Sequence, residues 1–158
     1  MSRAVQRFEE AARERGLRLD VRRFPAGTKT APDAARAVGC EVGQIVKSLV
    51  FVADEEPVLA LTSGANRADL AKLTAFTGAN EVRRATAKEA REATGFAIGG
   101  TPPFGFPRPV RTLMDRDLFA FQEVWAAAGA PDSVFPIAPD ELRRAAQAEA
   151  ADFREGSP

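Results

Sequence analysis

The feature that most constrains the fold of this 158-residue chain is an apolar run, residues 45–52, that carries a single charge at Lys47. Its β-branched and aromatic content predicts a buried β-strand. On such a strand Lys47 shares a face with Ile45, Leu49 and Phe51. The lysine therefore either reaches water along a sheet edge or points into a pocket walled by that apolar face. In a partly desolvated pocket an ammonium attracts carbonyl or phosphate oxygens strongly, and burial lowers a lysine's pKa, which would also let it act as a base.

A second unusual segment, residues 95–109, holds four glycines and four prolines with three phenylalanines between them. Glycine lets a ligand approach the main chain closely and permits positive φ, and proline stiffens a loop before binding. Segments of this kind often only turn a corner, but the length and aromatic content of this one favour the lining of a cleft. It has neither the P-loop nor the dinucleotide-binding spacing.

Composition excludes several kinds of chemistry. The chain has no histidine, so it contains neither a Ser-His nor a Cys-His pair and no histidine-containing metal site. Its one cysteine, Cys40, excludes an internal disulfide and a cysteine-based zinc site, and it is interpreted as a small buried hydrophobic residue. We therefore expect no metal and no cofactor. The formal net charge is zero, and the many arginines among the first 23 residues are interpreted as a solvated helix face.

The length suits one domain over residues 1–158, and no apolar run is long enough to cross a membrane. With no secretory signal pattern, we expect a cytoplasmic protein. Strands should outnumber helices and cluster in the middle and end of the chain, which predicts an α+β fold with a mixed sheet. The expected helices are 2–15, 31–38 (capped by Thr30), 69–76, 86–93 and from Pro139 to about Ala150, before a polar tail; the expected strands are 17–24, 45–52, 57–62, 110–114, 121–127 and 133–137.

Four segments, residues 34–39, 44–51, 94–105 and 124–129, together resemble the YbaK/EbsC family. This is the aminoacyl-tRNA editing domain that occurs free-standing or inserted in bacterial prolyl-tRNA synthetase. The resemblance covers nearly the whole chain in the family's order. Its most specific parts are the strand lysine and the Gly-Gly-x-x-Pro-Phe-Gly loop.

The resemblance implies a mixed, partly barrel-like β-sheet surrounded by helices, and hydrolysis of the ester that joins a wrong amino acid to proline tRNA. The implied partners are aminoacylated proline tRNA and prolyl-tRNA synthetase. Such an ester is already activated, so water can attack it, helped by the neighbouring ribose hydroxyl, while the enzyme positions it and stabilises negative charge.

The resemblance also implies which residues form the site. Lys47 would hold the substrate near its carbonyl or terminal phosphate, together with main-chain groups of Gly99 and Gly100 as catalytic groups. The expected substrate-binding residues of the loop are Thr101, Pro102, Pro103 and Phe104. Apart from the resemblance, Thr30 and Ser48 are added because their hydroxyls could orient a substrate, although nothing in their spacing singles them out.

One departure from the family concerns specificity. Many relatives have a histidine just after the Pro-Phe-Gly loop or in the loop after the Val-Trp strand, where this chain has Phe106 and residues 129–132. The edited amino acid therefore stays open: alanine is the first expectation, with cysteine, serine and 2-aminobutyrate as alternatives. The alternative functions are a non-catalytic tRNA- or synthetase-binding module with the same fold and a small-molecule-binding protein unrelated to translation.

Overall fold

The structure is a computed structural model that describes residues 2–28 and 30–156. Its described part contains the helices α1 (Arg3–Glu14), α2 (Ala31–Val38), α3 (Leu70–Thr77), α4 (Ala87–Thr94) and α5 (Pro139–Ala146). The strands are β1 (Arg22–Arg23), β2 (Ile45–Ala53), β3 (Glu56–Ser63), β4 (Val82–Arg84), β5 (Arg111–Asp115), β6 (Val124–Ala127), β7 (Ser133–Ile137) and β8 (Glu149–Ala151). None of the helices in these residues is long and apolar enough to cross a lipid bilayer.

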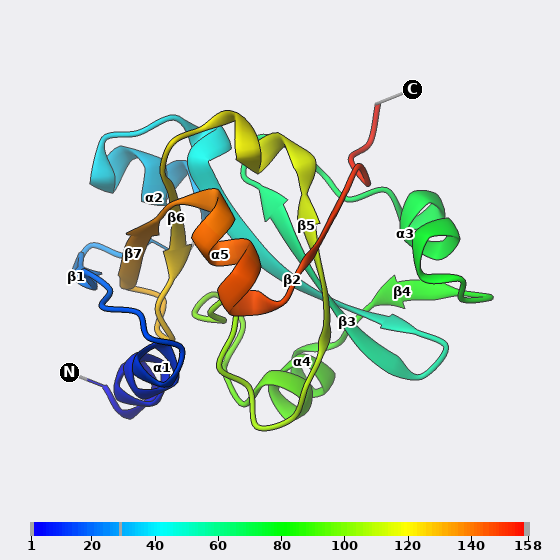
Figure 1. Cartoon of the computed structure of the whole chain (residues 1–158), viewed down its shortest axis with the longest axis horizontal. Coiled ribbons are helices and arrows are strands. Elements are labelled where there is room, and N and C mark those ends of the chain that lie inside the picture. The colour runs from blue at the N-terminus through cyan, green and yellow to red at the C-terminus, as the bar shows by residue number, and fades with distance from the viewer. Residues whose placement is uncertain (1, 29, 157–158) are drawn as a thin grey trace.

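The strands form one mixed sheet in the order β1-β7-β6-β2-β3-β5-β8, with β4 paired to β2 off this path. The predicted hairpin is confirmed: β2 and β3 are antiparallel along their length, from Val46 opposite Ser63 to Ala53 opposite Glu56. This hairpin crosses the centre of the molecule, with α1 and α2 towards one end and α3 towards the other (Figure 1). The α+β class with a mixed sheet is confirmed, and the sheet stays open rather than closing into a barrel.

Both faces of β2 are covered, as its nearly continuous apolar sequence predicts. On one face Val46 and Val50 belong to the largest core cluster, which also contains Phe8 of α1. The Phe8 ring lies 5.0 Å from those of Phe104 and Phe135. On the other face Phe51 packs in a second cluster with residues of α3, β5 and β8.

Three arginines near the N-terminus lie over aromatic rings. The guanidinium of Arg7 is 4.7 Å from the centroid of Phe96, that of Arg15 is 5.0 Å from Phe104, and that of Arg22 is 5.0 Å from Trp125. Arg7 and Arg15 also donate hydrogen bonds to main-chain carbonyls at the C-terminal ends of two helices, Gly95 O after α4 and Ala145 O in α5. The expected solvated face is therefore only partly right, because these side chains also hold α1 and β1 to the core.

Three predicted elements have other bounds in the structure. The strand expected over 17–24 is limited to Arg22–Arg23, because only these residues pair with β7, while Leu17, Leu19 and Val21 pack against the core without strand partners. The strand expected over 121–127 begins at Val124, since Phe121 still ends a short 3-10 helix. The third is the last helix. The other predicted helices and strands agree with the structure to within a few residues, including the cap at Thr30, while the short strand β4 was not predicted.

The C-terminal prediction is wrong. The last helix ends at Ala146, because Gln147 adopts a left-handed conformation with φ of 50°, and the chain then forms β8 in parallel with β5. The expected polar tail contains Phe153, which is fully buried. Sequence periodicity favours a longer helix here, but pairing with the free edge of β5 and burial of Phe153 outweigh it. The last two residues of that tail lie outside the described residues.

Replacing Phe153 with alanine should lower the free energy of unfolding by about 3–5 kcal/mol, because it removes a fully buried aromatic ring. Phe76→Ala is the matched control, since Phe76 on α3 is 39% exposed. Chemical denaturation of both variants measures the difference. Equal stabilities of the two variants would contradict the packing of the C-terminal segment described here.

Candidate active site

The candidate site lies where β2 lacks a strand partner on one edge. Along that edge β2 pairs with β6 only at Ile45 and Val46, and with β4 only from Phe51 to Ala53. Residues 47–50 therefore have no paired strand on this side, although they pair with β3 on the other. The unpaired stretch of β2 leaves an opening within the sheet, between β6 and β4.

The register directs main-chain groups of β2 into this opening. Gly64 N donates to Ile45 O at 2.7 Å, so Ile45 and every second residue after it direct their main-chain groups towards β3. The N–H and C=O of Ser48 and Val50 consequently face the opening. Val50 O is used, because it accepts a hydrogen bond from Ala85 N at 3.1 Å.

A cavity of about 410 Å³ occupies this opening. Its walls come from β2, the start of α2 with the residues before it, the end of β4, α4, β6 and the glycine-rich loop. The lining residues are Thr28, Thr30, Ala31, Pro32, Ile45, Val46, Lys47, Ser48, Leu49, Val50, Gly64, Arg84, Ala85, Ala90, Ile98, Gly99, Thr101 and Ala127. The volume is typical of small-ligand sites, which run from about 300 to 1,000 Å³.

Lys47 lines this cavity and is only partly accessible. Its Nζ donates a hydrogen bond to the main-chain oxygen of Asn66 at 2.6 Å. Burial lowers the pKa of Lys47 from the ordinary lysine value of 10.5; the charges of Arg67 and Arg84 lower it further, and Asp115 opposes them. Of the two alternatives for this side chain, the structure shows the pocket and not a freely solvated amine.

The glycine-rich loop approaches the same cavity through a tight turn over residues 97–100. Gly100 N and the Thr101 hydroxyl both donate to Ala97 O, each at 3.1 Å, and Gly99 has a φ of 91°. A Cβ on Gly100 would lie 2.7 Å from the Cα of Ala130, so this position admits only glycine without a backbone shift. The turn is thereby held against the loop that follows β6.

The structure brings together only some of the predicted site residues. Thr30, Lys47, Ser48, Gly99 and Thr101 all line the cavity. Gly100 belongs to the same turn, but it is buried against Ala130 and does not line the cavity. The prediction that the whole segment 95–109 lines one cleft is therefore too broad, because only Ile98, Gly99 and Thr101 of this segment line the cavity.

Pro102, Pro103 and Phe104 are buried and lie outside the lining of this cavity. Phe104 packs between Phe8 and Phe135 in the core, and it lines, with Pro103, a separate groove. The physical reason is that the aromatic ring gains more from core burial than from facing a polar opening. This placement gives the three residues a supporting position behind the turn.

Sequence reasoning missed three residues of the site. Arg84 lines the cavity, Ile98 is 56% exposed at its wall, and Asn66 accepts the lysine hydrogen bond. Arg84 lies on β4, a three-residue strand too short to give an alternating pattern. Ile98 could have been found from the sequence, because a large apolar residue next to Gly99 is uncommon in a glycine-rich loop. Asn66 acts through its main chain, which no side-chain pattern reveals.

The described lining of the cavity contains no carboxylate, and the chain has no histidine. Its charged groups are cations, Lys47 and Arg84, with Arg67 close enough to affect the lysine. The Oγ of Ser48 is buried and has no hydrogen-bond partner among the described residues. The arrangement suits a substrate with negative or developing negative charge on oxygen, and it offers hydroxyl and main-chain groups for orientation. Within residues 2–28 and 30–156, no group of three acidic or cysteine side chains is placed to hold a metal ion.

Comparison with known proteins shows the family of this chain. Residues 25–145 match the profile of the aminoacyl-tRNA editing domain, so the chain belongs to that family. A crystal structure of a candidate trans-editing enzyme for prolyl-tRNA synthetase superimposes with a TM-score of 0.94 and is 48% identical, over 99% of both chains.

Two curated relatives extend the comparison. The protein YwhH of Bacillus subtilis (strain 168) is 30% identical over 123 residues, 78% of both this chain and the relative. A proline–tRNA ligase of Streptococcus thermophilus (strain ATCC BAA-491 / LMD-9) is 33% identical over 129 residues, 81% of this chain. The match spans 20% of that ligase's own length, so it concerns one part of the larger enzyme.

The charges around Lys47 give a prediction on its pKa. Nuclear magnetic resonance titration of the lysine side chains, with the Lys47 signal assigned by its loss in Lys47→Ala, should place this pKa below 10.5. Arg84→Ala should raise it, because a neighbouring positive charge that opposes protonation is lost, and Asp115→Asn should lower it. Arg22→Ala is the control that should leave it unchanged, because Arg22 lies outside the lining of the cavity and is not among the charges that shift this pKa. A rise after Asp115→Asn would contradict the assigned electrostatics.

Proposed function

We propose that this chain is a trans-editing hydrolase that removes a wrongly attached amino acid from proline tRNA by hydrolysing the aminoacyl ester. The family supports editing as the activity, and the relatives described as a proline–tRNA ligase and a trans-editing enzyme for prolyl-tRNA synthetase support proline tRNA as the carrier. Alanine is the first candidate for the amino acid, with cysteine, serine and 2-aminobutyrate as alternatives. Prolyl-tRNA synthetase is the second proposed partner.

The observation that carries the proposal is the held ammonium of Lys47 at the unpaired edge of β2. The lysine is fixed by Asn66 O in a cavity that also receives Gly99 and Thr101 of the turn. A partly desolvated cation stabilises negative charge on an ester or phosphate oxygen more strongly than one in water. The N–H of Ser48, which faces the opening, and the exposed turn offer main-chain groups to orient the aminoacyl end.

In the proposed reaction a water molecule attacks the ester carbonyl carbon, and negative charge develops on the carbonyl oxygen beside Lys47. The bond between that carbon and the ribose oxygen then breaks. The water supplies a hydroxyl to the released amino acid and a proton to the ribose oxygen, and the adjacent ribose hydroxyl is placed to relay that proton. No net oxidation or second substrate is required.

The reaction needs no protein nucleophile. Burial and the carboxylates of Glu123 and Glu41 raise the pKa of the Cys40 thiol, which disfavours its reactive thiolate form. Cys40 lies outside the lining of the cavity, and its Sγ contacts Glu41 O at 3.4 Å. Activity should therefore come from positioning and charge, which is consistent with a lining without carboxylates.

The cavity also supports a size criterion for the amino acid. Its apolar wall is formed by alanines and by branched side chains such as Val46, Val50 and Ile98. We expect a small side chain to fit beside the ester without displacing these residues and the rigid ring of the correct prolyl ester to contact them. Exclusion by size is the second sieve of editing, and one methylene is typically worth a factor of about 10–200.

A deacylation panel tests this function. Proline tRNA charged in turn with alanine, cysteine, serine, 2-aminobutyrate and proline is incubated with the purified chain, and release is measured above the rate without protein. We expect fastest release of one small amino acid and at least about tenfold slower release of proline. Salt-sensitive binding of the tRNA without release of any amino acid would instead favour the non-catalytic module. Absence of both would favour a small-molecule-binding protein.

Lys47→Ala should reduce kcat for deacylation by about 10²–10³, because it removes a preorganised group beside the developing oxyanion. Lys88→Ala is the matched control, since the exposed Lys88 on α4 lies outside the lining of the cavity and forms a surface ion pair with Glu92 at 4.0 Å. Circular dichroism and thermal melting of both variants verify that the fold is retained. Unchanged turnover in folded Lys47→Ala would refute the mechanism.

A further inference from the structure

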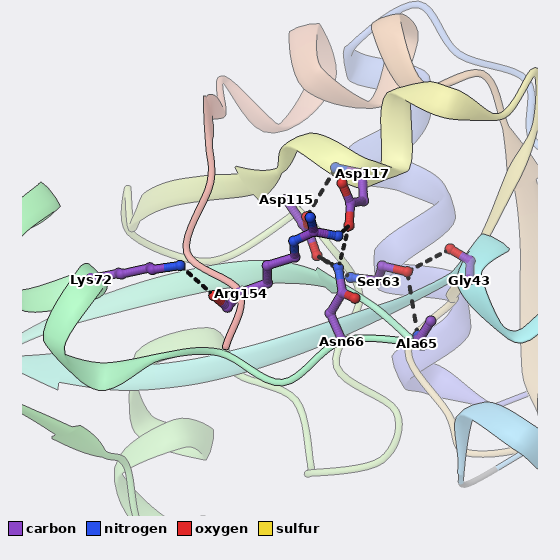
Figure 2. A network of polar contacts seen from close by, with 8 residues as sticks. All are labelled: Gly43, Ser63, Ala65, Asn66, Lys72, Asp115, Asp117 and Arg154. Carbon is purple, nitrogen blue, oxygen red and sulfur yellow. Dashed lines mark hydrogen bonds and ion pairs between the residues drawn. The ribbon is translucent and has the colours of Figure 1, made fainter. Parts of the chain in front are cut away.

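The residue that holds Lys47 is itself fixed from several sides. Asn66 N donates to Ser63 O at 2.9 Å, and its side-chain Nδ2 donates to Asp115 Oδ2 and to Asp117 Oδ2, both at 2.9 Å. Figure 2 shows the Asn66 amide directed at these two carboxylates. With its main-chain N–H and its side-chain amide both engaged, and with Arg67 O held by Glu155 N, Asn66 has little conformational freedom. Its carbonyl is therefore presented to Lys47 Nζ in one orientation.

Asp115 is the buried centre of this network, with 1% of its surface exposed. One of its oxygens accepts from Ser63 N at 3.0 Å and from Asn66 Nδ2, and the other accepts from Asp117 N at 3.0 Å. A buried carboxylate is tolerated when its oxygens are paired in this way. Its place at the end of β5 therefore fixes both the end of β3 and the segment that follows it.

The second carboxylate is tied to the C-terminal segment. Arg154 Nη1 lies 2.7 Å from Asp117 Oδ2, in an ion pair whose two side chains are each 40% exposed. Asp117 thus accepts from a guanidinium and from the Asn66 amide at once. The cation compensates for the two neighbouring carboxylates, which would otherwise repel each other.

The same C-terminal segment holds the main chain next to Asn66. Asp69 N donates to Phe153 O at 2.7 Å, and Glu155 N donates to Arg67 O at 2.8 Å. Lys72 Nζ donates to Arg154 O at 2.7 Å, a contact that Figure 2 shows at the outer end of the network. Residues 66–69 are therefore enclosed between β5 on one side and residues 153–155 on the other.

We propose that Asn66 is a positioning residue for Lys47, and that Asp115, Asp117 and Arg154 hold it in the required orientation. The inference rests on the proposed function, because it assigns Asn66 a part in the same site. An asparagine is suited to this position, since its amide supplies two N–H donors to two carboxylates. Aspartate has the same shape, but it has no donor in its ionised form and adds a third negative charge.

The test uses the full chain with Asn66→Ala and Asn66→Asp, alone and combined with Lys47→Ala. Each single variant should lower kcat/KM for the best substrate of the panel by about tenfold or more, because a misplaced catalytic group loses its geometric advantage. Asn66→Asp should lose more than Asn66→Ala. In the Lys47→Ala background, measured at high enzyme concentration, neither change should reduce the residual rate further, because the group through which Asn66 acts is gone.

Variants of Arg154 test the outer contacts of the network that holds Asn66. They also provide a test if an Asn66 variant does not fold. Arg154→Ala should lower kcat/KM, and Arg154→Lys should restore part of it by returning a cation to Asp117. Arg111→Ala is the matched control, because Arg111 forms a comparable exposed ion pair with Glu149, 3.6 Å away on the same sheet. It should change stability without changing turnover.

A readout independent of activity separates this inference from the proposed function. In the wild-type chain the Lys47 ammonium protons should be protected from exchange with solvent in a nuclear magnetic resonance spectrum, and Asn66→Ala should abolish that protection. Protection without any deacylation would leave the positioning intact and refute the proposed function. Unchanged protection in Asn66→Ala, or equal losses of activity with and without Lys47, would overturn the positioning role.

Discussion

The geometry of the site depends on one interruption in the hydrogen bonding of a central strand. On one edge β2 pairs with β3 along its length. On the other edge its first residues pair with β6 and its last residues pair with β4, so that residues 47–50 between them have no strand partner. An unpaired edge in the middle of a sheet exposes main-chain donors and acceptors at a depth where side chains normally cover them. The apolar walls, the lysine and the turn at Gly99 all meet at this opening. A complete ladder would leave no room for the cavity.

The position of the charge within this opening is set by groups behind it. Lys47 reaches an acceptor on the loop after β3, and that loop is fixed by the end of β5 and by the C-terminal segment. A flexible lysine has many rotamers, so its contribution depends on how firmly its partner is held. The buried Asp115 holds this loop in place. Its carboxylate loses its hydration on burial, and hydrogen bonds from three N–H donors offset that loss.

Sequence reasoning found the hairpin, its lysine and the glycine-rich turn, because each has a strong local signal. A lone charge in an apolar run marks Lys47, and a positive φ requires a residue such as Gly99. It failed where tertiary contacts decide. The helix expected to reach Ala150 yields to β8, and Phe104 is drawn into the core and away from the cavity. Asn66 stayed undetected because its main chain makes the contact. The spacing of Ser48 does not single it out, whereas the structure shows a buried hydroxyl without a hydrogen-bond partner among the described residues.

The arginines stacked on Phe96, Phe104 and Trp125 change how the molecule looks to a polyanion. Arg7 and Arg15 also donate to main-chain carbonyls and Arg22 pairs with Asp20, so part of the charge of each guanidinium is engaged within the protein. Counting basic residues along the N-terminal segment therefore overstates the attraction that this segment exerts on a nucleic acid. The cavity, by contrast, has Lys47 and Arg84 in its lining and Arg67 close enough to lower the pKa of Lys47, so the cavity itself presents positive charge to a negatively charged ligand.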